Sequence, residues 1–191
     1  MTIEQAFSEH ARVMALASRA LPPVISRVAD TIHACLSGGH SILACGNGGS
    51  AADAEHFVAE LVGRFRGERR GLSAVALTAS GPTVTALSND YGYDRVFARQ
   101  VEALARAGDA LLAISTSGNS ANVIEAARAA RARTCTVIAL TGADGGHLAA
   151  HADIAILAPS TVVARVQEVH AFCIHAIVEA LDARLSLDGV S

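Results

Sequence analysis

The chain has 191 residues, of which 51% are hydrophobic and 17% charged, so it carries ample apolar material for the core of one domain. A net charge of -3 gives no attraction to nucleic acid, whose binding needs clustered Lys and Arg, and no apolar run approaches the roughly 18 residues of a membrane span. Neither nucleic acid nor a membrane is an expected partner. The first residues lack a basic region followed by an apolar segment, so we expect a cytoplasmic protein.

The first predicted elements are helices. Apolar residues recur at spacings of three and four from residue 2 to about 36, Pro22 and Pro23 break this run, and Gly38 and Gly39 end it. The pattern predicts two helices joined at the prolines. We expect this N-terminal segment, residues 1–36, to serve packing and oligomerisation. No internal repeat, low-complexity tract or long linker divides the chain, which predicts a single domain over residues 1–191.

Five short apolar runs follow, most of them succeeded by a helical pattern. They read as continuous apolar stretches rather than as alternation, which is typical of strands covered on both faces. They occupy residues 42–45, 74–77, 110–114, 136–140 and 154–157. The economical fold is α/β: a three-layer αβα sandwich with a five-stranded parallel sheet, plus the N-terminal helices. A long helical segment, about residues 161–185, is apolar enough to pack against another element or another subunit.

The cysteines are widely spaced and include no C-x-x-C pair, which argues against a disulfide framework and against a thiolate zinc cluster. They are Cys35, Cys45, Cys135 and Cys173. We expect buried, reduced thiols at these positions.

Two loops rich in glycine and hydroxyl groups each join a predicted strand to a predicted helix. They are Gly46-Asn47-Gly48-Gly49-Ser50 and Ser115-Thr116-Ser117-Gly118-Asn119-Ser120. In an open parallel sheet, ligands collect at the carboxyl ends of strands, where helices point free N–H groups and positive dipole ends. Glycines allow close backbone approach, and the amide and hydroxyl groups offer hydrogen bonds. The two loops together predict binding of a phosphorylated sugar.

A purely structural role for these loops is also open. Gly, Ser and Asn are ordinary turn and N-cap residues, so either loop alone would be unremarkable in function. Neither loop fits the G-x-x-x-x-G-K-[ST] nucleotide pattern, and the first lacks the full G-x-G-x-x-G spacing of a dinucleotide fold. Two such loops at the ends of neighbouring strands favour a ligand site.

A second set of polar residues lies on predicted helices. His56 and Glu60 are four apart and share a helix face, so both can reach one metal ion or one substrate, although such a pair alone is usually a surface contact. Gln167 and His175 are about 80° apart on a helical wheel with ~3.6 residues per turn, so they can share a face as well. His170 is also near Gln167 in projection, and geometry alone does not choose between the two histidines.

Several motifs occur together in a characteristic order. They are GNGGS at 46–50 leading to AEHF at 54–57, SNDYG at 88–92, GD at 108–109, STSGNSANVI at 115–124 and RVQEVH at 165–170. In this order and spacing, which spans nearly the whole chain, the sequence resembles the bacterial phosphoheptose isomerases. The resemblance implies the sugar isomerase (SIS) fold, a flavodoxin-like arrangement, and a homotetramer with active sites at subunit interfaces.

The resemblance also implies a reaction and a metal. The reaction is the aldose–ketose isomerisation of sedoheptulose 7-phosphate to D-glycero-D-manno-heptose 7-phosphate through an enediol, the first step of activated heptose biosynthesis for surface polysaccharide such as lipopolysaccharide. The metal is zinc, one ion per subunit. By residue-to-residue match, its ligands fall on His56, Glu60, Gln167 and His175. This chemistry needs a base and an acid, which we assign to Glu60 and His175.

The same match places substrate contacts on both loops and beyond them. Phosphate contacts fall on Ser115, Thr116, Ser117 and Ser120. Sugar contacts fall on Asn47, Ser50, Arg64 and Asp90, and we include Gly48, Gly49, Asn89 and Gln167 in the substrate-binding set. For Arg64, which begins a basic cluster, a position in a solvated loop without a ligand is an equally good interpretation.

One departure from the family pattern brings alternatives into play. Ala164 stands where some members have an aspartate, and a paralogue group that binds the bacterial replication initiator also has alanine there. The alternatives are a non-catalytic SIS interaction protein related to that paralogue, and an SIS protein acting on another sugar phosphate. The first predicts loss of the metal ligands, and the second does not need them. All four ligands are present, which favours the isomerase.

Overall fold

The computed structural model describes residues 2–187. Its strands are β1 (Ile42–Cys45), β2 (Ala74–Ala76), β3 (Ala110–Ser115), β4 (Thr136–Thr141) and β5 (Ile154–Leu157). All strand pairs are parallel, and the order β2-β1-β3-β4-β5 is that of a flavodoxin-like, doubly wound sheet. The predicted fold class is confirmed, and the five predicted strands agree with those observed to within one residue at each end.

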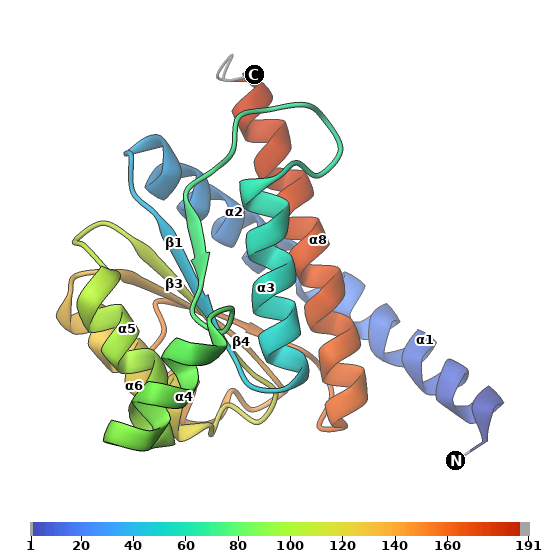
Figure 1. Cartoon of the computed structure of the whole chain (residues 1–191). Helices are drawn as coiled ribbons and strands as arrows, with labels where there is room; N and C mark the ends of the chain where they lie inside the picture. Colours follow the sequence, from blue (N-terminus) through green and yellow to red (C-terminus); the bar gives the residue numbers. More distant parts are fainter. Residues whose placement is uncertain (1, 188–191) are drawn as a thin grey trace.

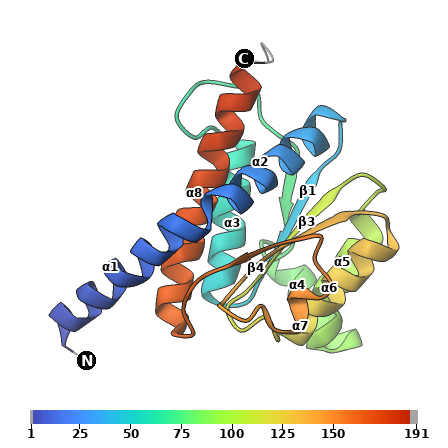
Figure 2. The ribbon, with the colours of Figure 1, turned by 180° about the vertical axis from the view of Figure 1, so that it is seen from behind.

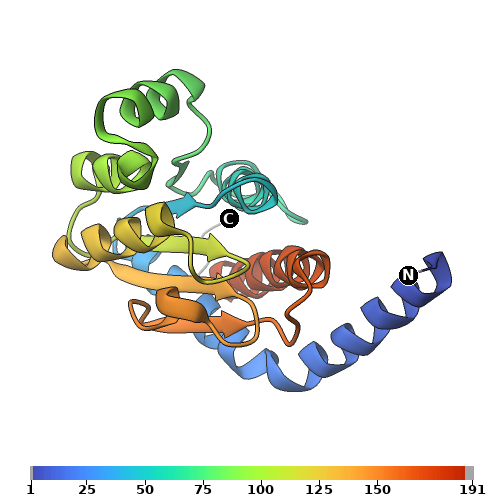
Figure 3. The same ribbon diagram turned by 90° about the horizontal axis from the view of Figure 1, so that it is seen from below.

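Helices cover both faces of the sheet (Figures 1 and 3). They are α1 (Ile3–Ala20), α2 (Pro22–Ser37), α3 (Gly49–Val62), α4 (Gly81–Tyr91), the 3-10 helix η1 (Tyr93–Arg95), α5 (Val96–Leu104), α6 (Ala121–Ala132), α7 (Gly146–Ala149) and α8 (Val163–Leu187). One apolar core unites α1, α2, α3 and α8 with the sheet, and a second core unites α4 to α7 with its other face. Within residues 2–187, no helix combines the length and the apolar character that crossing a membrane requires.

The central strand β3 shows why the strands read as continuous apolar runs. Successive side chains of a strand point to opposite faces of the sheet. Leu112 joins the core formed with α3 and α8, whereas its neighbour Leu111 joins the core formed with α5 and α6. Both are almost completely buried. Because helices cover both faces, every position is apolar and the alternation of an exposed sheet is lost.

The two N-terminal helices lie across α8 (Figure 2). Thr2 and Gln5 form a capping box at the start of α1. Pro22 and Pro23 stand in the first turn of α2, where a missing N–H costs nothing, so the prolines begin the second helix and the break falls at Leu21. The start of α1 extends away from the body (Figure 1), and Phe7 is 72% exposed. A role of this helix in oligomerisation stays a prediction.

All four cysteines are buried and free, as the sequence predicts. Burial raises the pKa of Cys45 and of Cys173 to about 12. These groups are therefore neutral thiols at physiological pH. They fill core positions and offer no thiolate for metal binding or nucleophilic chemistry.

The turn after β3 packs closely on the turn after β4. Gly118 has a φ of +64°, and a Cβ at this position would overlap the carbonyl group of Gly145. The Gly118 carbonyl also accepts a hydrogen bond from the Leu148 N–H at 2.8 Å. Only glycine satisfies both the left-handed backbone and the close approach.

We expect Gly118→Ala to lower the free energy of unfolding by more than the roughly 1–3 kcal/mol of a strained backbone residue, because the new methyl group must also displace backbone atoms. Equilibrium urea denaturation measures this loss. Gly67→Ala is the control, since a Cβ in this exposed connection meets nothing within 4 Å, and its stability should match or slightly exceed that of the natural protein. Equal stabilities of the two variants would contradict the close approach.

Candidate active site

The two glycine- and hydroxyl-rich loops lie side by side because β1 and β3 are neighbours in the sheet. The first loop leads from β1 into α3, and the second leads from β3 into α6. Ser50 in the first turn of α3 and Ser115 at the end of β3 are both buried. The predicted adjacency of the loops is thus observed, with the N-termini of two helices at the same edge of the sheet.

A pair of amides connects the loops. Asn47 Nδ2 donates to Asn122 Oδ1 at 2.8 Å, and Asn122 Nδ2 donates back to Asn47 Oδ1 at 2.9 Å. The Tyr93 hydroxyl donates to the same Asn47 oxygen at 2.8 Å. Sequence reasoning missed Asn122 and Tyr93. The signal for Asn122 is a polar side chain in a first helical turn that is only 2% exposed, and its burial is visible only in the fold.

The hydroxyl groups of the second loop gather at the start of α6. Ser115 and Ser120 share a hydrogen bond of 3.0 Å between their Oγ atoms. Ser120 is the N-cap residue, yet its side chain makes no capping bond, so the hydroxyl is directed to Ser115. Ser117 Oγ accepts from the Asn119 N–H at 3.1 Å, and Thr116 is partly buried beside it. Neutral donors and a positive helix end form a cradle for an anion.

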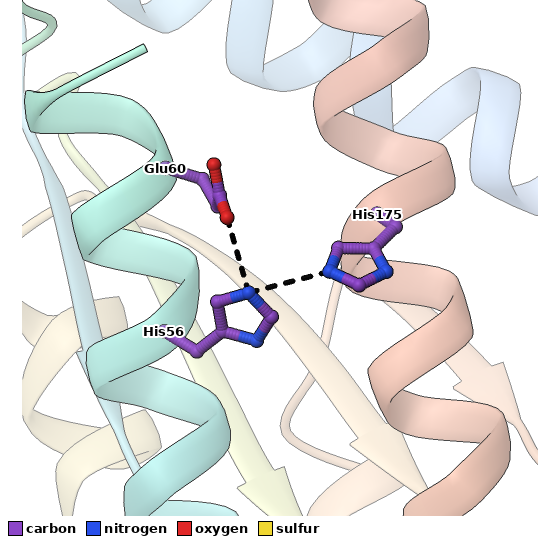
Figure 4. Close-up of side chains that lie close together, drawn as sticks. All are labelled: His56, Glu60 and His175. Atoms are coloured by element: carbon purple, nitrogen blue, oxygen red, sulfur yellow. Dashed lines mark hydrogen bonds and ion pairs between the residues drawn. The ribbon is translucent and has the colours of Figure 1, made fainter. Parts of the chain in front are cut away.

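Three potential metal ligands converge between α3 and α8 (Figure 4). His56 Nε2 lies 3.1 Å from Glu60 Oε1 and 3.3 Å from His175 Nε2. One donor atom of each residue lies within 4.8 Å of the others. A tetrahedral zinc ion with bonds of about 2.0–2.2 Å holds its ligand atoms about 3.3–3.6 Å apart. The two contacts of His56 Nε2 are close to this separation and all three donor atoms lie within 4.8 Å, so the residue types suit such an ion once the side chains close around it. The structure selects His175 rather than His170 as the partner of His56 and Glu60.

The surroundings of this triad, His56, Glu60 and His175, are partly apolar. The Phe65 ring stacks on the His175 ring with centroids 5.7 Å apart. Asp53, one turn before His56, has a buried Oδ2 atom without a hydrogen-bond partner. Burial raises the pKa of Asp53, and the nearby His56 opposes that rise. Sequence reasoning missed both Phe65 and Asp53.

Gln167 and His170 occupy separate positions on α8. The Gln167 amide lies directly against Gly49, where a Cβ would overlap its nitrogen. Gln167 and His175 are eight residues apart, about 12 Å along the helix, so only their side chains can bring them to one ion, and the role of Gln167 as a metal ligand stays a prediction. His170 is fully buried, and its Nε2 lies 3.1 Å from the Thr141 carbonyl oxygen. That ring nitrogen must be the donor, which leaves Nδ1 as a buried acceptor without a partner.

The remaining predicted residues lie on the surface of the described chain. Arg64 forms an ion pair with Glu68, with 3.6 Å between Nε and Oε2, and its side chain is 59% exposed. Asn89 and Asp90 are exposed near the end of α4 and bond to each other. Gly48 is exposed beside Asn47. The role of these residues in substrate binding stays a prediction.

Known proteins match this fold and these motifs. The SIS domain family model matches residues 7–142. A phosphoheptose isomerase from Shewanella sp. (strain ANA-3) is 50% identical over 186 residues, which cover 96% of this chain and 94% of that protein. The chain belongs to the phosphoheptose isomerase family of SIS-domain proteins.

Solved structures agree with this family membership. The phosphoheptose isomerase of Neisseria gonorrhoeae is 48% identical with a TM-score of 0.90, over 95% of this chain and 97% of that one. That of Francisella tularensis is 38% identical with a TM-score of 0.93, over 96% of this chain and 100% of that one. The NanR protein of Vibrio vulnificus, solved in complex with ManNAc-6P, is 18% identical with a TM-score of 0.72, over 96% of this chain and 63% of that one. This last likeness concerns the fold alone, so the reaction must be argued from the site.

The contribution of the Asn47–Asn122 amide pair to the stability of this phosphoheptose isomerase family member can be tested by substitution. We expect Asn122→Leu, which keeps the branching of the side chain at Cγ and removes both hydrogen bonds, to lower the free energy of unfolding by about 1–3 kcal/mol. Urea denaturation measures the change. Asn89→Leu is the matched control on an exposed helix position and should change stability by no more than about 0.5 kcal/mol. Similar losses in both variants would argue against a special role of the pair.

His170 gives a second test, through the pH dependence of stability. Burial lowers the pKa of His170, and its bond to the Thr141 carbonyl only partly opposes this. The unfolded chain therefore binds a proton on this imidazole near pH 6.5, where the folded chain does not, and stability falls as the pH drops below about 6.5 towards the folded pKa. His170→Gln keeps a donor for Thr141 and removes this contribution.

We expect the His170→Gln protein to lose less stability than the natural protein between about pH 7.5 and about pH 5.5. Urea denaturation of both proteins with a metal chelator present removes any contribution of metal binding. Identical pH dependence of the two proteins would show that His170 is not held neutral by the fold.

Proposed function

We propose that the protein is an aldose–ketose isomerase that converts sedoheptulose 7-phosphate to D-glycero-D-manno-heptose 7-phosphate, the first step of activated heptose biosynthesis. The observation that carries the proposal is the convergence of His56, Glu60 and His175 between α3 and α8, where α3 is the helix that the first loop begins. The 50% sequence identity to a phosphoheptose isomerase, over 96% of the chain, supports the same reaction. We further propose a cytoplasmic homotetramer with active sites at subunit interfaces, serving surface polysaccharide such as lipopolysaccharide.

The phosphate group is proposed to bind at the start of α6. Ser115, Thr116, Ser117 and Ser120 offer hydroxyl donors there, and the free N–H groups of the first helical turn point the same way. Such neutral donors satisfy a phosphate monoester without a lysine. Asn122 supports this cradle by fixing Asn47 of the neighbouring loop.

The sugar is proposed to lie between this cradle and the triad. The first loop offers the Asn47 and Ser50 side chains and the open backbone at Gly48 and Gly49. Gln167 lies against Gly49 and faces the same region from α8. Arg64, Asn89 and Asp90 complete the proposed set, and their exposure in the single chain agrees with sites that another subunit covers.

The reaction moves a proton between adjacent carbons. Glu60 is proposed to remove the proton from the carbon beside the carbonyl group, and His175 to protonate the carbonyl oxygen, which yields the enediol. Return of the proton to the former carbonyl carbon, with loss of the neighbouring hydroxyl proton, completes the isomerisation. The Phe65 ring stacks on the His175 ring and restricts the orientation of the acid.

One zinc ion per subunit is the proposed cofactor, held by His56, Glu60, His175 and Gln167. When bound, zinc supplies a Lewis acid that polarises the carbonyl and hydroxyl oxygens of the sugar. A carboxylate fully engaged by a metal is a poorer base, so Glu60 is proposed to serve as ligand at rest and as base during turnover. The donor geometry of the triad supports the first of these roles.

We expect the purified, metal-analysed protein to convert sedoheptulose 7-phosphate to an aldose phosphate, followed by NMR. Glu60→Gln removes the base and should lower kcat by about 100-fold or more, the usual range for loss of a general base. A Glu60→Gln protein that keeps zinc and full activity would refute the assignment of the base.

Two outcomes point to the alternatives. No turnover with zinc intact favours an SIS enzyme for another sugar phosphate. No turnover and no zinc favours a non-catalytic interaction protein, for which the alanine at position 164 is the one sequence feature in support.

A further inference from the structure

The connection between α3 and β2, residues 63–73, contacts α8 at several points. Its Phe65 stacks on His175, and its Arg66 forms an ion pair with Glu179. Arg69 Nε then donates to Asp182 Oδ1 at 2.8 Å. The three partners on α8 lie four and three residues apart, so they occupy successive turns of one helix face. The connection therefore follows α8 from the triad towards the C-terminal end of the helix.

Arg69 also binds the end of α3. Its Nη2 donates to the backbone oxygen of Glu60 at 2.6 Å, and its Nη1 donates to the backbone oxygen of Leu61 at 2.9 Å. These oxygens belong to the last turn of α3, whose carbonyl groups have no partner within the helix. A guanidinium group at this end also compensates the negative end of the helix dipole. One side chain thus fixes the backbone of Glu60 and a carboxylate on α8.

The Arg69–Asp182 ion pair is largely buried and is not a surface contact. The Arg69 side chain is 5% exposed and the Asp182 side chain 19% exposed. Asp182 Oδ2 is buried and has no hydrogen-bond partner, so the carboxylate depends on the bond that Oδ1 accepts from Arg69. Loss of one member of a buried pair leaves the other charge unpaired, which strongly favours any rearrangement that returns that charge to water.

We propose that Arg69 and Asp182 are positioning residues that hold the last turn of α3 against α8, so that Glu60 and His56 meet His175 at metal-binding distance. The inference rests on the metal set of the proposed function. Neither residue bonds to the triad donor atoms, and the effect is transmitted through the backbone of Glu60 and through the six residues of α8 between His175 and Asp182. A ligand set tolerates displacements of only about 0.5 Å before affinity falls.

Cobalt alone tests the proposal without the sugar. The metal-free protein is titrated with Co²⁺, and the visible absorption bands report both affinity and coordination geometry. We expect Arg69→Met and Asp182→Asn to weaken Co²⁺ binding about 10-fold or more and to change the bands, as is usual when groups that orient metal ligands are lost. Arg69→Lys keeps a positive charge and a donor group, so its Co²⁺ affinity should lie between that of these two variants and that of the natural protein. The variant that combines Arg69→Met and Asp182→Asn should lose no more Co²⁺ affinity than the weaker-binding of the two single variants, because the pair acts as a unit.

The Arg184–Asp30 pair is the matched control. Arg184 Nε donates to Asp30 Oδ1 at 2.7 Å and its Nη1 donates to the Ala180 backbone oxygen, so the bonded groups are the same, but the pair joins α8 to α2 and is more exposed, at 23% for Arg184 and 64% for Asp30. Arg184→Met should lower the melting temperature and leave Co²⁺ affinity and absorption bands unchanged. A merely structural role of Arg69 would make the two variants alike.

Unchanged Co²⁺ affinity and bands in folded Asp182→Asn or Arg69→Lys overturn the proposal, and these mild substitutions serve if Arg69→Met does not fold. Failure of the proposed function has a different signature. If the natural protein binds Co²⁺ no better than a His175→Ala variant, the metal set itself is wrong, whatever Arg69 does.

Discussion

The packing of α3 against α8 is the contact on which the candidate site depends. Neither helix alone carries enough ligands, because α3 supplies His56 and Glu60 and only α8 supplies His175. Fully buried side chains hold the contact, among them Phe57 of α3 and Ile174 of α8. A close-packed interior resists small displacements, so the distance between the helices is fixed with the accuracy that a metal or a proton transfer needs.

The order of the strands adds a second constraint. Because β1 and β3 are neighbours, the N-termini of α3 and α6 meet at one edge of the sheet. Their dipoles and free N–H groups then act on the same ligand. The chain needs no lysine at this point, and the reciprocal bonds between Asn47 and Asn122 keep the two helix ends in register.

The strands and the two glycine- and hydroxyl-rich loops could be predicted because each is specified by a short stretch of sequence. Continuous apolar runs follow from burial on both faces, and the loops follow from glycine and hydroxyl groups between a strand and a helix. Asn122, Asp53 and Arg69 could not be predicted, since their importance lies in burial and in partners such as Asp182, which is 113 residues from Arg69. The contact of the Gln167 amide with Gly49 could not be predicted either, because a helical wheel does not show contacts between elements, and the assignment of Gln167 as a metal ligand stays a prediction.

The two halves of the site are separated along α3, and this separation suits a long substrate. The proposed phosphate site lies at the start of α3 and α6, whereas Glu60 lies in the last turn of α3, about 15 Å along the helix from Ser50. A seven-carbon sugar carries its phosphate at one end and its reacting carbonyl near the other, so it must contact both places at once. Binding energy from the phosphate can then position the distant carbons for proton transfer, which raises the rate without tighter binding at the reacting centre. The length of α3 therefore sets the distance between the proposed phosphate site and Glu60, and the bond from Arg69 to the Glu60 backbone oxygen holds the far end of that helix in place.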